Sequence, residues 1–231
     1  MRPWIVLPTY NEADNVLGVV GAVRAAVPEA RVLVVDDASP DGTGVLADAV
    51  AEADPAVSVL HRPGKAGLCQ AYVAGFTRAL EQGATHVVEM DCDFSHDPAD
   101  LPRLLRTDGD LVLGSRYVPG GAVENWHPLR RAISRGGCWY ARRVLRVPVR
   151  DLTGGFKCFT AEALHAIDYR TLRAEGYAFQ VETTYRAIKA GFRVIEVPIL
   201  FHDRRVGNSK MSGRIVIEAA LRVPAMRWRN D

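Results

Sequence analysis

Short apolar runs alternate with segments of helical spacing over the first half of the chain. Apolar, β-branched runs predict strands, and apolar positions three or four residues apart predict helices. The predicted strands cover residues 4–7, 31–35, 56–61, 86–90 and 111–113, and the predicted helices cover residues 15–27, 44–53 and 68–82. This alternation predicts an α/β fold with a mostly parallel sheet flanked by helices on both faces.

The second half of the chain has a less regular pattern. We predict a mobile loop at 114–135, a basic helix at 134–145, a Gly-rich turn at 151–157, a helix at 182–190, a strand at 193–200 and a flexible polar loop at 202–212. Residues 215–228 have apolar positions at helical spacing, with arginines between them. We therefore divide the chain into one domain over 1–212 and an amphipathic basic segment over 213–231. That segment suits a membrane interface or packing on the core.

Acidic residues follow three of the predicted strands. Glu12 comes after the first strand, Asp36 and Asp37 end the second, and Asp91 and Asp93 follow the strand at 86–90. Because ligands bind at the carboxyl ends of the strands in such sheets, we expect these clusters to converge on one edge. Two carboxylates two residues apart suit a hard divalent cation. Asp91 and Asp93 therefore predict a metal site, and a solvated turn is the competing interpretation.

The motifs present and absent in the chain exclude several other kinds of site. A calcium loop starting at Asp91 would need Gly at its sixth position and Glu at its twelfth, where this chain has His96 and Pro102. The segment 62–67 lacks the Gly-Lys-Ser/Thr ending of a phosphate-binding P-loop, and the chain contains no GxGxxG, GxSxG or HExxH motif. The turn-forming residues at 36–43 suit a helix cap as well as a ligand site.

Composition and charge add limits on location and partners. The 231 residues are 48% hydrophobic with a net charge of +2, so bulk charge gives no indication of nucleic-acid binding. Residues 125–150 contain arginines and no acidic residue, which suits phosphates, an anionic membrane surface or a solvated helix face. Four cysteines without paired metal spacing favour a reducing, cytoplasmic setting. No apolar stretch is long enough to span a membrane, so we expect peripheral attachment to the cytoplasmic face, or a membrane-spanning partner subunit.

Several short motifs occur in order along the chain. They are residues 7–12, 35–43, 65–68, 90–98, 114–117, 130–136, 151–156, 176–180 and 207–212. In these segments the chain resembles the family-2 inverting glycosyltransferases, which have the Rossmann-like GT-A fold. Within that family it is most similar to the polyprenol-phosphate (dolichol-phosphate) mannose synthases. The resemblance implies transfer of mannose from GDP-mannose to a polyprenyl phosphate, with inversion.

The resemblance also implies roles for the residues that match these motifs. The donor would be bound by Pro8, Tyr10, Glu12, Val35, Asp37, Asp91, Cys92, Asp93, Arg204 and Lys210. Mg²⁺ or Mn²⁺ would be held by Asp91 and Asp93, and Ser95 stands where some members have Gln as a third ligand. The acceptor phosphate would face Arg116, Arg130 and Ser134. Asp93, Arg116 and Arg130 would be the catalytic residues.

The implied chemistry suits this inventory of residues. A phosphate monoester has a second pKa near ~6, so it is largely a dianion at neutral pH and already a nucleophile. It needs positioning by cations more than it needs a general base. The leaving nucleoside diphosphate needs charge neutralisation, which a metal ion and arginines provide.

Two alternatives remain open at this stage. One is glucosyl transfer from UDP-glucose to the same lipid, because Val35 and Asp37 do not discriminate between the bases. The other is a non-catalytic subunit that binds a nucleotide sugar. Retention of Asp91, Asp93 and the basic residues argues against the second alternative.

Overall fold

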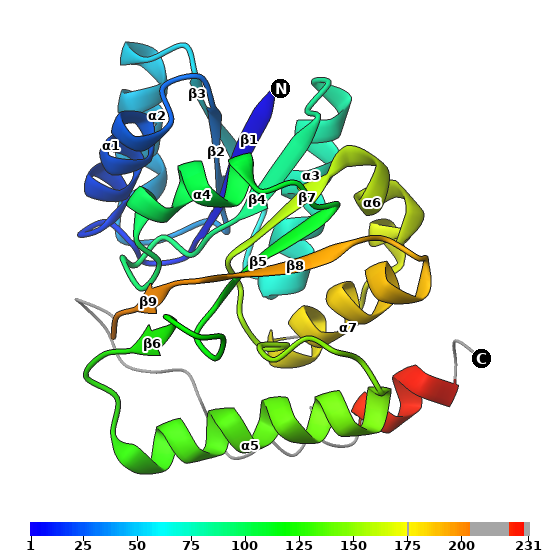
Figure 1. The fold of residues 1–231 in the computed structure, drawn as a ribbon. Helices are drawn as coiled ribbons and strands as arrows, with labels where there is room; N and C mark the ends of the chain where they lie inside the picture. Colours follow the sequence, from blue (N-terminus) through cyan, green and yellow to red (C-terminus); the bar gives the residue numbers. More distant parts are fainter. Residues whose placement is uncertain (175, 204–221, 229–231) are drawn as a thin grey trace.

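The computed structural model describes residues 1–174, 176–203 and 222–228. At its centre is a seven-stranded sheet in the order β3-β2-β1-β4-β7-β5-β8 (Figure 1). The strands are β1 (Pro3–Thr9), β2 (Arg31–Asp36), β3 (Val57–His61), β4 (His86–Glu89), β5 (Leu111–Ser115), β7 (Lys157–Thr160) and β8 (Val194–Pro198). Only β7 runs antiparallel to its neighbours, β4 and β5. The predicted α/β fold with a mostly parallel sheet is confirmed.

Helices cover both faces of this sheet. Side chains along β1 alternate between two hydrophobic cores, with Trp4 and Val6 in the first and Ile5 and Leu7 in the second. The first core is covered by α3 (Leu68–Glu81), α6 (Ala161–Ala166) and α7 (Gly176–Lys189). The second is covered by α1 (Val16–Ala26), α2 (Thr43–Ala53) and α4 (Leu101–Arg106). Short 3₁₀ turns, η1 (Pro98–Asp100) and η2 (Tyr169–Thr171), complete the two layers.

The strands and helices predicted for the first half are present, and the departures from the prediction are additional elements and shifted boundaries, most of them in the second half. Helices α4 and α6 and strand β7 were not predicted, and α7 begins at 176 instead of 182. The turn predicted at 151–157 gives way to β7 at Lys157. This strand has only four residues, and a fully buried lysine begins it, so it lacks the apolar run that marks the other central strands.

Helix α5 (Pro128–Leu145) corrects the prediction of a loop over 114–135. The helix begins at Pro128 instead of 134, because proline suits the first turn and the His127 ring accepts a hydrogen bond from the backbone N–H of Leu129. Upstream of it, β6 (Ala122–Val123) pairs in parallel with β9 (Leu200–Phe201). The segment is therefore held at both ends, although its Gly, Pro and Arg content is typical of loops.

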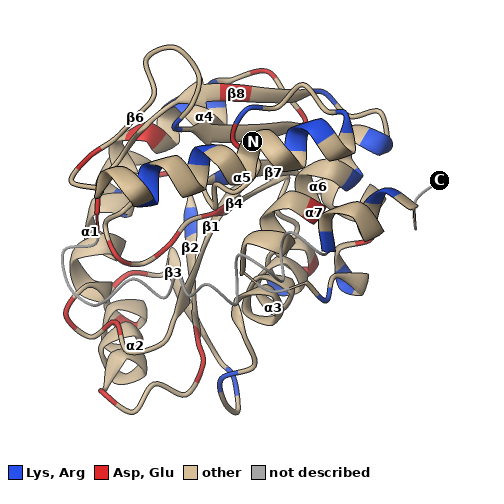
Figure 2. Ribbon diagram, turned by 90° about the horizontal axis from the view of Figure 1, so that it is seen from below, with Lys and Arg blue, Asp and Glu red and all other residues tan. Residues whose placement is uncertain are grey.

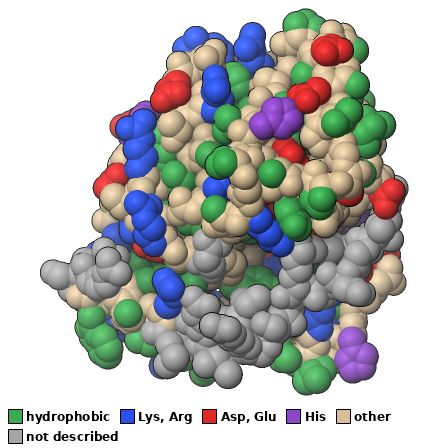
Figure 3. All heavy atoms as spheres, turned by 180° about the vertical axis from the view of Figure 1, so that it is seen from behind, with side chains coloured by type: hydrophobic (Ala, Val, Ile, Leu, Met, Phe, Trp, Pro, Cys, Tyr) green, Lys and Arg blue, Asp and Glu red, His purple; other side chains and the backbone are tan. Residues whose placement is uncertain are grey.

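Helix α5 crosses the end of the sheet with arginines along its length (Figure 2). Only a narrow stripe of it is buried, made by Cys138, Ala141 and Leu145. Seen from behind, Lys and Arg side chains also gather along one edge of the molecule, on the side where α6 and α7 lie in Figure 1 (Figure 3). The net charge of the chain is low, but its basic residues are therefore concentrated in separate regions of the surface.

The described part of the C-terminal segment is helical and packs on the main domain. Val223 and Met226 join the first core, and Arg227 donates a hydrogen bond to the backbone oxygen of Val144. Most of the loop predicted at 202–212 and the first part of the helix predicted at 215–228 lie outside the described residues. All four cysteines are buried free thiols. Of the helices that the structure describes, none is long and apolar enough to cross a membrane.

Candidate active site

The loops after β1 and β2 are joined by hydrogen bonds at the carboxyl edge of the sheet. The backbone N–H of Asn11 donates to Ser39 Oγ at 3.1 Å, and that of Glu12 donates to Thr43 Oγ1 at 2.9 Å. Asn11 itself has a left-handed backbone with φ of 60°, a conformation that asparagine tolerates better than most residues. The two loops are therefore held side by side at this edge, as expected for the ends of neighbouring parallel strands.

The two aspartates that follow the buried part of β2 have different roles. Asp36 accepts hydrogen bonds from the hydroxyls of Thr9 and Ser39 and from the backbone N–H of Ser39. Asp37 instead pairs with Arg62, Oδ1 to Nη1, at 2.6 Å. Burial raises the pKa of Asp37 although the charge of Arg62 opposes it. Asp36 therefore stabilises the turn after β2, whereas Asp37 forms an ion pair with Arg62 at the end of the strand.

The other residues expected at the nucleoside lie in this region with differing exposure. Tyr10 is partly buried, and the ammonium of Lys65 lies 4.0 Å from its ring centroid. Pro8 is also partly buried. Val35 has no exposed surface and packs beside Gly75, so its side chain belongs to the core beneath the site.

Asp91 and Asp93 lie on a tight loop directly after β4. The hydroxyl of Tyr72 donates to Asp91 Oδ1 at 3.4 Å, and the backbone N–H of Ser95 donates to Asp93 Oδ1 at 3.0 Å. The His96 ring closes the loop, because its Nδ1 accepts from the backbone N–H of Asp91 at 3.3 Å. Cys92, between the two aspartates, points into the second core.

This loop suits a hard cation, although it does not form a closed cage. Nowhere in the described part of the chain do three His, Cys, Asp or Glu side chains gather as a metal cluster. Ser95 Oγ is buried and has no hydrogen-bond partner among the described residues. A buried oxygen without a partner beside two carboxylates fits an oxygen-ligand site in which waters and substrate supply the remaining ligands.

Arg116 follows β5 and is held by Asp151 from the loop before β7. Its Nε donates to Asp151 Oδ2 at 2.7 Å and its Nη2 donates to Oδ1 at 2.6 Å, a two-pronged arrangement. Nη2 also donates to Thr153 Oγ1 at 2.9 Å. Burial opposes both charges, yet the pair outweighs it, so the pKa of Asp151 lies below and that of Arg116 above its ordinary value. Arg116, expected to face the acceptor phosphate, thus has most of its donors committed to the protein.

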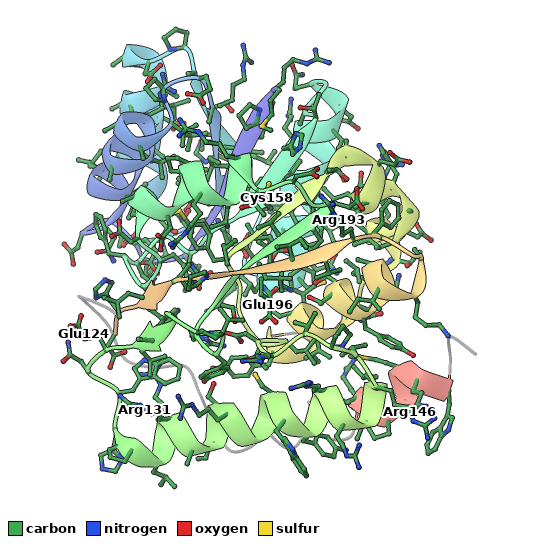
Figure 4. The ribbon with its side chains drawn as sticks, in the orientation of Figure 1. Glu124, Arg131, Arg146, Cys158, Arg193 and Glu196 are labelled. Atoms are coloured by element: carbon green, nitrogen blue, oxygen red, sulfur yellow. The ribbon has the colours of Figure 1, made fainter. Side chains whose placement is uncertain are left out.

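Glu196 on β8 fixes the loop that carries Asp151 (Figure 4). Its carboxylate accepts from the hydroxyl of Ser115 at 2.7 Å and from the backbone N–H groups of Arg150 and Asp151 at 2.8 and 2.9 Å. Cys138 on α5 lies 3.2 Å from Thr153 Oγ1. These contacts connect the end of β5, the loop before β7 and α5 into one support for Arg116.

Arg130 lies on the first turn of α5, and Ser134 lies one turn further along. Arg130 pairs with Asp203 at 2.9 Å, and its guanidinium lies 4.1 Å from the centroid of the Trp126 ring. The Ser134 hydroxyl accepts from the hydroxyl of Tyr117 at 2.7 Å. Arg116 also lies over Trp126, at 5.5 Å, so this ring joins the two arginines.

The structure therefore brings the predicted acidic residues and the predicted arginines to the same end of the sheet. Arg204 and Lys210 lie outside the described residues. Sequence reasoning gave no role to Asp151 or Trp126. Asp151 lies within a matched motif, which was a usable signal, whereas nothing in the spacing of Trp126 marked it.

Comparisons with known proteins identify the family and several relatives of the chain. Residues 4–168 match the model of glycosyl transferase family 2. The chain is 50% identical to undecaprenyl-phosphate mannosyltransferase from Micrococcus luteus, over 99% of this chain and 96% of the relative. It is 48% identical to polyprenol monophosphomannose synthase from Mycolicibacterium smegmatis, over 96% and 85% respectively.

A solved structure shows the same fold at much lower identity. Glucosyl-3-phosphoglycerate synthase from Mycobacterium tuberculosis, crystallised with Mn²⁺ and UDP-glucose, matches with a TM-score of 0.68 and 18% identity, over 99% of this chain and 78% of that one. The family match over most of the chain and the two near full-length relatives confirm the resemblance inferred from the motifs. The chain belongs to glycosyl transferase family 2.

Proposed function

We propose that this enzyme transfers mannose, with inversion, from GDP-mannose to a polyprenyl monophosphate. The observation that carries the proposal is that Asp91 and Asp93 lie at the same end of the sheet as Arg116 and Arg130. A transferase with a phosphate acceptor needs cationic groups for both a donor diphosphate and an acceptor phosphate. The names of the two near full-length relatives, an undecaprenyl-phosphate mannosyltransferase and a polyprenol monophosphomannose synthase, support the same acceptor.

Asp91 and Asp93 are the residues that would hold Mg²⁺ or Mn²⁺, with the Ser95 hydroxyl as a further oxygen. When bound, the ion neutralises charge on the donor diphosphate. The unpartnered Ser95 Oγ supports its inclusion, because a buried hydroxyl without a hydrogen bond is costly unless a ligand occupies it. The backbone hydrogen bond from Ser95 to Asp93 keeps that carboxylate fixed on the loop.

The nucleoside end of the donor belongs at the joined loops after β1 and β2. Tyr10 offers a ring face, Glu12 and Asp37 offer carboxylates, and Pro8 and Val35 shape the floor. Because Asp37 already pairs with Arg62, the two present adjacent acceptor and donor groups to the edge of a base. Cys92 contributes only its backbone, since its side chain is buried in the second core.

The acceptor end belongs at the arginines. Arg130 and Ser134 lie on successive turns of α5, where a phosphate dianion would meet a guanidinium and a hydroxyl. Arg116 contributes through the guanidinium donors that Asp151 and Thr153 leave available, since the Asp151 carboxylate offsets its charge. Held there, the phosphate oxygen attacks the anomeric carbon in line with the departing diphosphate and needs no proton removed.

The lipid part of the acceptor implies attachment to a membrane surface, and α5 supplies a suitable face. Leu129, Ile133 and Trp139 are exposed, and helical spacing puts them opposite the buried stripe of this helix. Exposed arginines flank them, as in helices that lie in a membrane interface. The free thiols favour the cytoplasmic face of the membrane.

A donor panel tests the function. The purified chain would receive radiolabelled GDP-mannose, UDP-glucose or UDP-N-acetylglucosamine with undecaprenyl phosphate and Mn²⁺ or Mg²⁺. We expect label in the organic phase with GDP-mannose and a β-linked product. Label from UDP-glucose alone would replace mannosyl by glucosyl transfer, and no label from any donor would reject a lipid-phosphate acceptor.

A further inference from the structure

One buried tryptophan joins the two arginines of the acceptor end. Trp126 precedes α5 and is 7% exposed. The guanidinium of Arg130 lies 4.1 Å from its ring centroid and that of Arg116 lies 5.5 Å from it. Both distances are within the range of cation–π attraction, for which tryptophan is the best ring. The same side chain thus contacts two cations that come from separate parts of the chain.

The contacts of Trp126 continue to the metal-binding loop. Its ring meets Phe201 edge to face at 5.4 Å, and Phe201 meets the His96 ring edge to face at 5.3 Å. His96 in turn accepts a hydrogen bond from the backbone of Asp91. Three rings therefore form a continuous row between the arginines and the loop that carries the two aspartates.

The row is anchored on its other side as well. His96 stacks on Phe156 with ring centroids 5.0 Å apart, and the backbone N–H of His202 donates to the backbone oxygen of Ser95 at 3.1 Å. Phe201 lies on β9, which pairs with β6 just upstream of Trp126. The spacing between the metal loop and the arginines is consequently set by packed rings and a small sheet, not by a flexible connection.

Two buried donors in this row have no hydrogen-bond partner among the described residues. They are Trp126 Nε1 and Arg130 Nε, on side chains that contact each other. Buried donors are nearly always paired in folded proteins, so two unpaired neighbours indicate a place where an acceptor group is expected. Asp203 pairs with Arg130 through Nη1 and leaves Nε unpaired.

We propose that Trp126 is a positioning residue for acceptor binding. Its ring holds Arg116 and Arg130 together for a phosphate and fixes their distance from the loop of Asp91 and Asp93. The inference rests on the proposed function, since it assigns the arginines to the acceptor. Tryptophan is favoured over an aliphatic side chain because an aromatic face attracts both guanidinium groups, the buried one of Arg116 and the partly exposed one of Arg130.

Two substitutions separate the effect of the aromatic face of Trp126 from the effect of its volume. Trp126→Leu removes the aromatic face, whereas Trp126→Phe retains a smaller one and loses Nε1. A matched control is Phe159→Leu, which removes a fully buried aromatic ring from the first core, away from the arginines. Each variant would be assayed for binding of farnesyl phosphate and of GDP by calorimetry, for acceptor KM and kcat, and for melting temperature.

For Trp126→Leu we expect farnesyl phosphate affinity to fall about tenfold and acceptor KM to rise to a similar extent, as the loss of two cation–π contacts implies. GDP affinity should stay within about twofold of wild type, and Trp126→Phe should recover about half of the loss on a logarithmic scale. Phe159→Leu should lower the melting temperature and leave both affinities unchanged.

Unchanged farnesyl phosphate affinity in Trp126→Leu would overturn the inference, and so would an equal loss of GDP and farnesyl phosphate affinity, which indicates general disruption. Failure of the proposed function is a separate result. In that case the wild-type chain itself neither binds farnesyl phosphate nor transfers mannose, and the inference falls with it.

Discussion

Glu89 and Lys157 lie directly opposite each other on the antiparallel strands β4 and β7, and neither has any exposed surface. Lys157 Nζ donates to the backbone oxygen of Gln180 at 2.7 Å and to Thr183 Oγ1 at 2.9 Å, so it also ties β7 to α7. Burial raises the pKa of Glu89 to about 7 and lowers that of Lys157 to about 8, although each charge favours the other. Glu89 lies two residues before Asp91 in the chain.

This pair predicts a pH dependence of stability that a single substitution should remove. A carboxyl whose pKa is higher in the folded than in the unfolded state stabilises the fold at low pH, and the gain is lost as the pH rises. The free energy of unfolding should therefore fall between pH 4.5, the ordinary value, and about 7, the folded value, as measured by urea denaturation. In Glu89→Gln this slope should largely disappear.

Glu162→Gln is the matched control, because this exposed glutamate on α6 should keep the wild-type slope. A Glu89→Gln variant with an unchanged slope would show that Glu89 is ionised in the folded protein throughout this range. Its effect on stability would then have to come from packing alone.

Asp93→Asn tests the metal-binding role. Asparagine keeps an oxygen for the backbone N–H of Ser95, so the loop should stay folded and the melting temperature should change little. We expect kcat to fall by at least about a hundredfold, since charge neutralisation at the leaving diphosphate is worth several kcal/mol. Full activity of this variant, or of wild type in excess EDTA, would remove the metal from the proposed reaction.

Ser95→Ala tests whether the buried hydroxyl takes part. If Ser95 Oγ is a ligand of the ion or of its water, the Mn²⁺ concentration for half-maximal activity should rise several-fold, and kcat at saturating Mn²⁺ should be nearly unchanged. If the hydroxyl is an unsatisfied structural group, its removal should leave metal activation alone and raise the melting temperature. The first outcome changes metal activation, and the second changes only the melting temperature.

Arg116 and Asp151 should behave as a coupled pair in stability measurements. Asp151→Asn leaves a buried guanidinium without its counter-charge, which costs about 3–5 kcal/mol. Arg116→Met leaves the opposite charge and should cost a similar amount. The double variant should lose less than the sum of the two, in a urea-denaturation cycle, and additive losses would argue against a direct charge interaction.

The same pair shows what the sequence can and cannot reveal. Asp91 and Asp93 were predictable because they follow an apolar strand, and parallel strands bring their carboxyl ends together. The contact of Asp151 with Arg116 could not be predicted from spacing, although the segment 151–156 matches a motif, because it depends on β7, an antiparallel strand inserted between β4 and β5 that lacks an apolar run. A local pattern carries no information about which non-adjacent strand a short segment will join.

Trp126 illustrates a second limit. Its position depends on the two-residue strands β6 and β9, which are too short to produce a periodic pattern. The loop composition of 114–135 also concealed the start of α5, because Gly, Pro and Arg are common in turns. Only the proline and the capping histidine at 127–128 marked the helix boundary, and these signals are weak without tertiary context.

Helix α5 should govern attachment to lipid bilayers. Replacing Leu129, Ile133 and Trp139 together by serine should lower binding to vesicles that contain phosphatidylglycerol by at least about tenfold, because each apolar side chain buried in the interface contributes roughly 1.5–3 kcal/mol. Binding of wild type should also weaken with added salt, since arginines on this helix attract anionic lipid. Co-sedimentation with vesicles measures both effects.

Val45→Ser is the matched control, because Val45 is 73% exposed on α2 and belongs to a different part of the surface. Transfer to a short, water-soluble prenyl phosphate separates attachment from catalysis. The triple variant should keep its activity on that acceptor and lose activity on undecaprenyl phosphate in vesicles. Equal vesicle binding by the triple variant and wild type would assign the membrane contact to another surface, whereas equal loss on both acceptors would place these side chains at the acceptor phosphate itself.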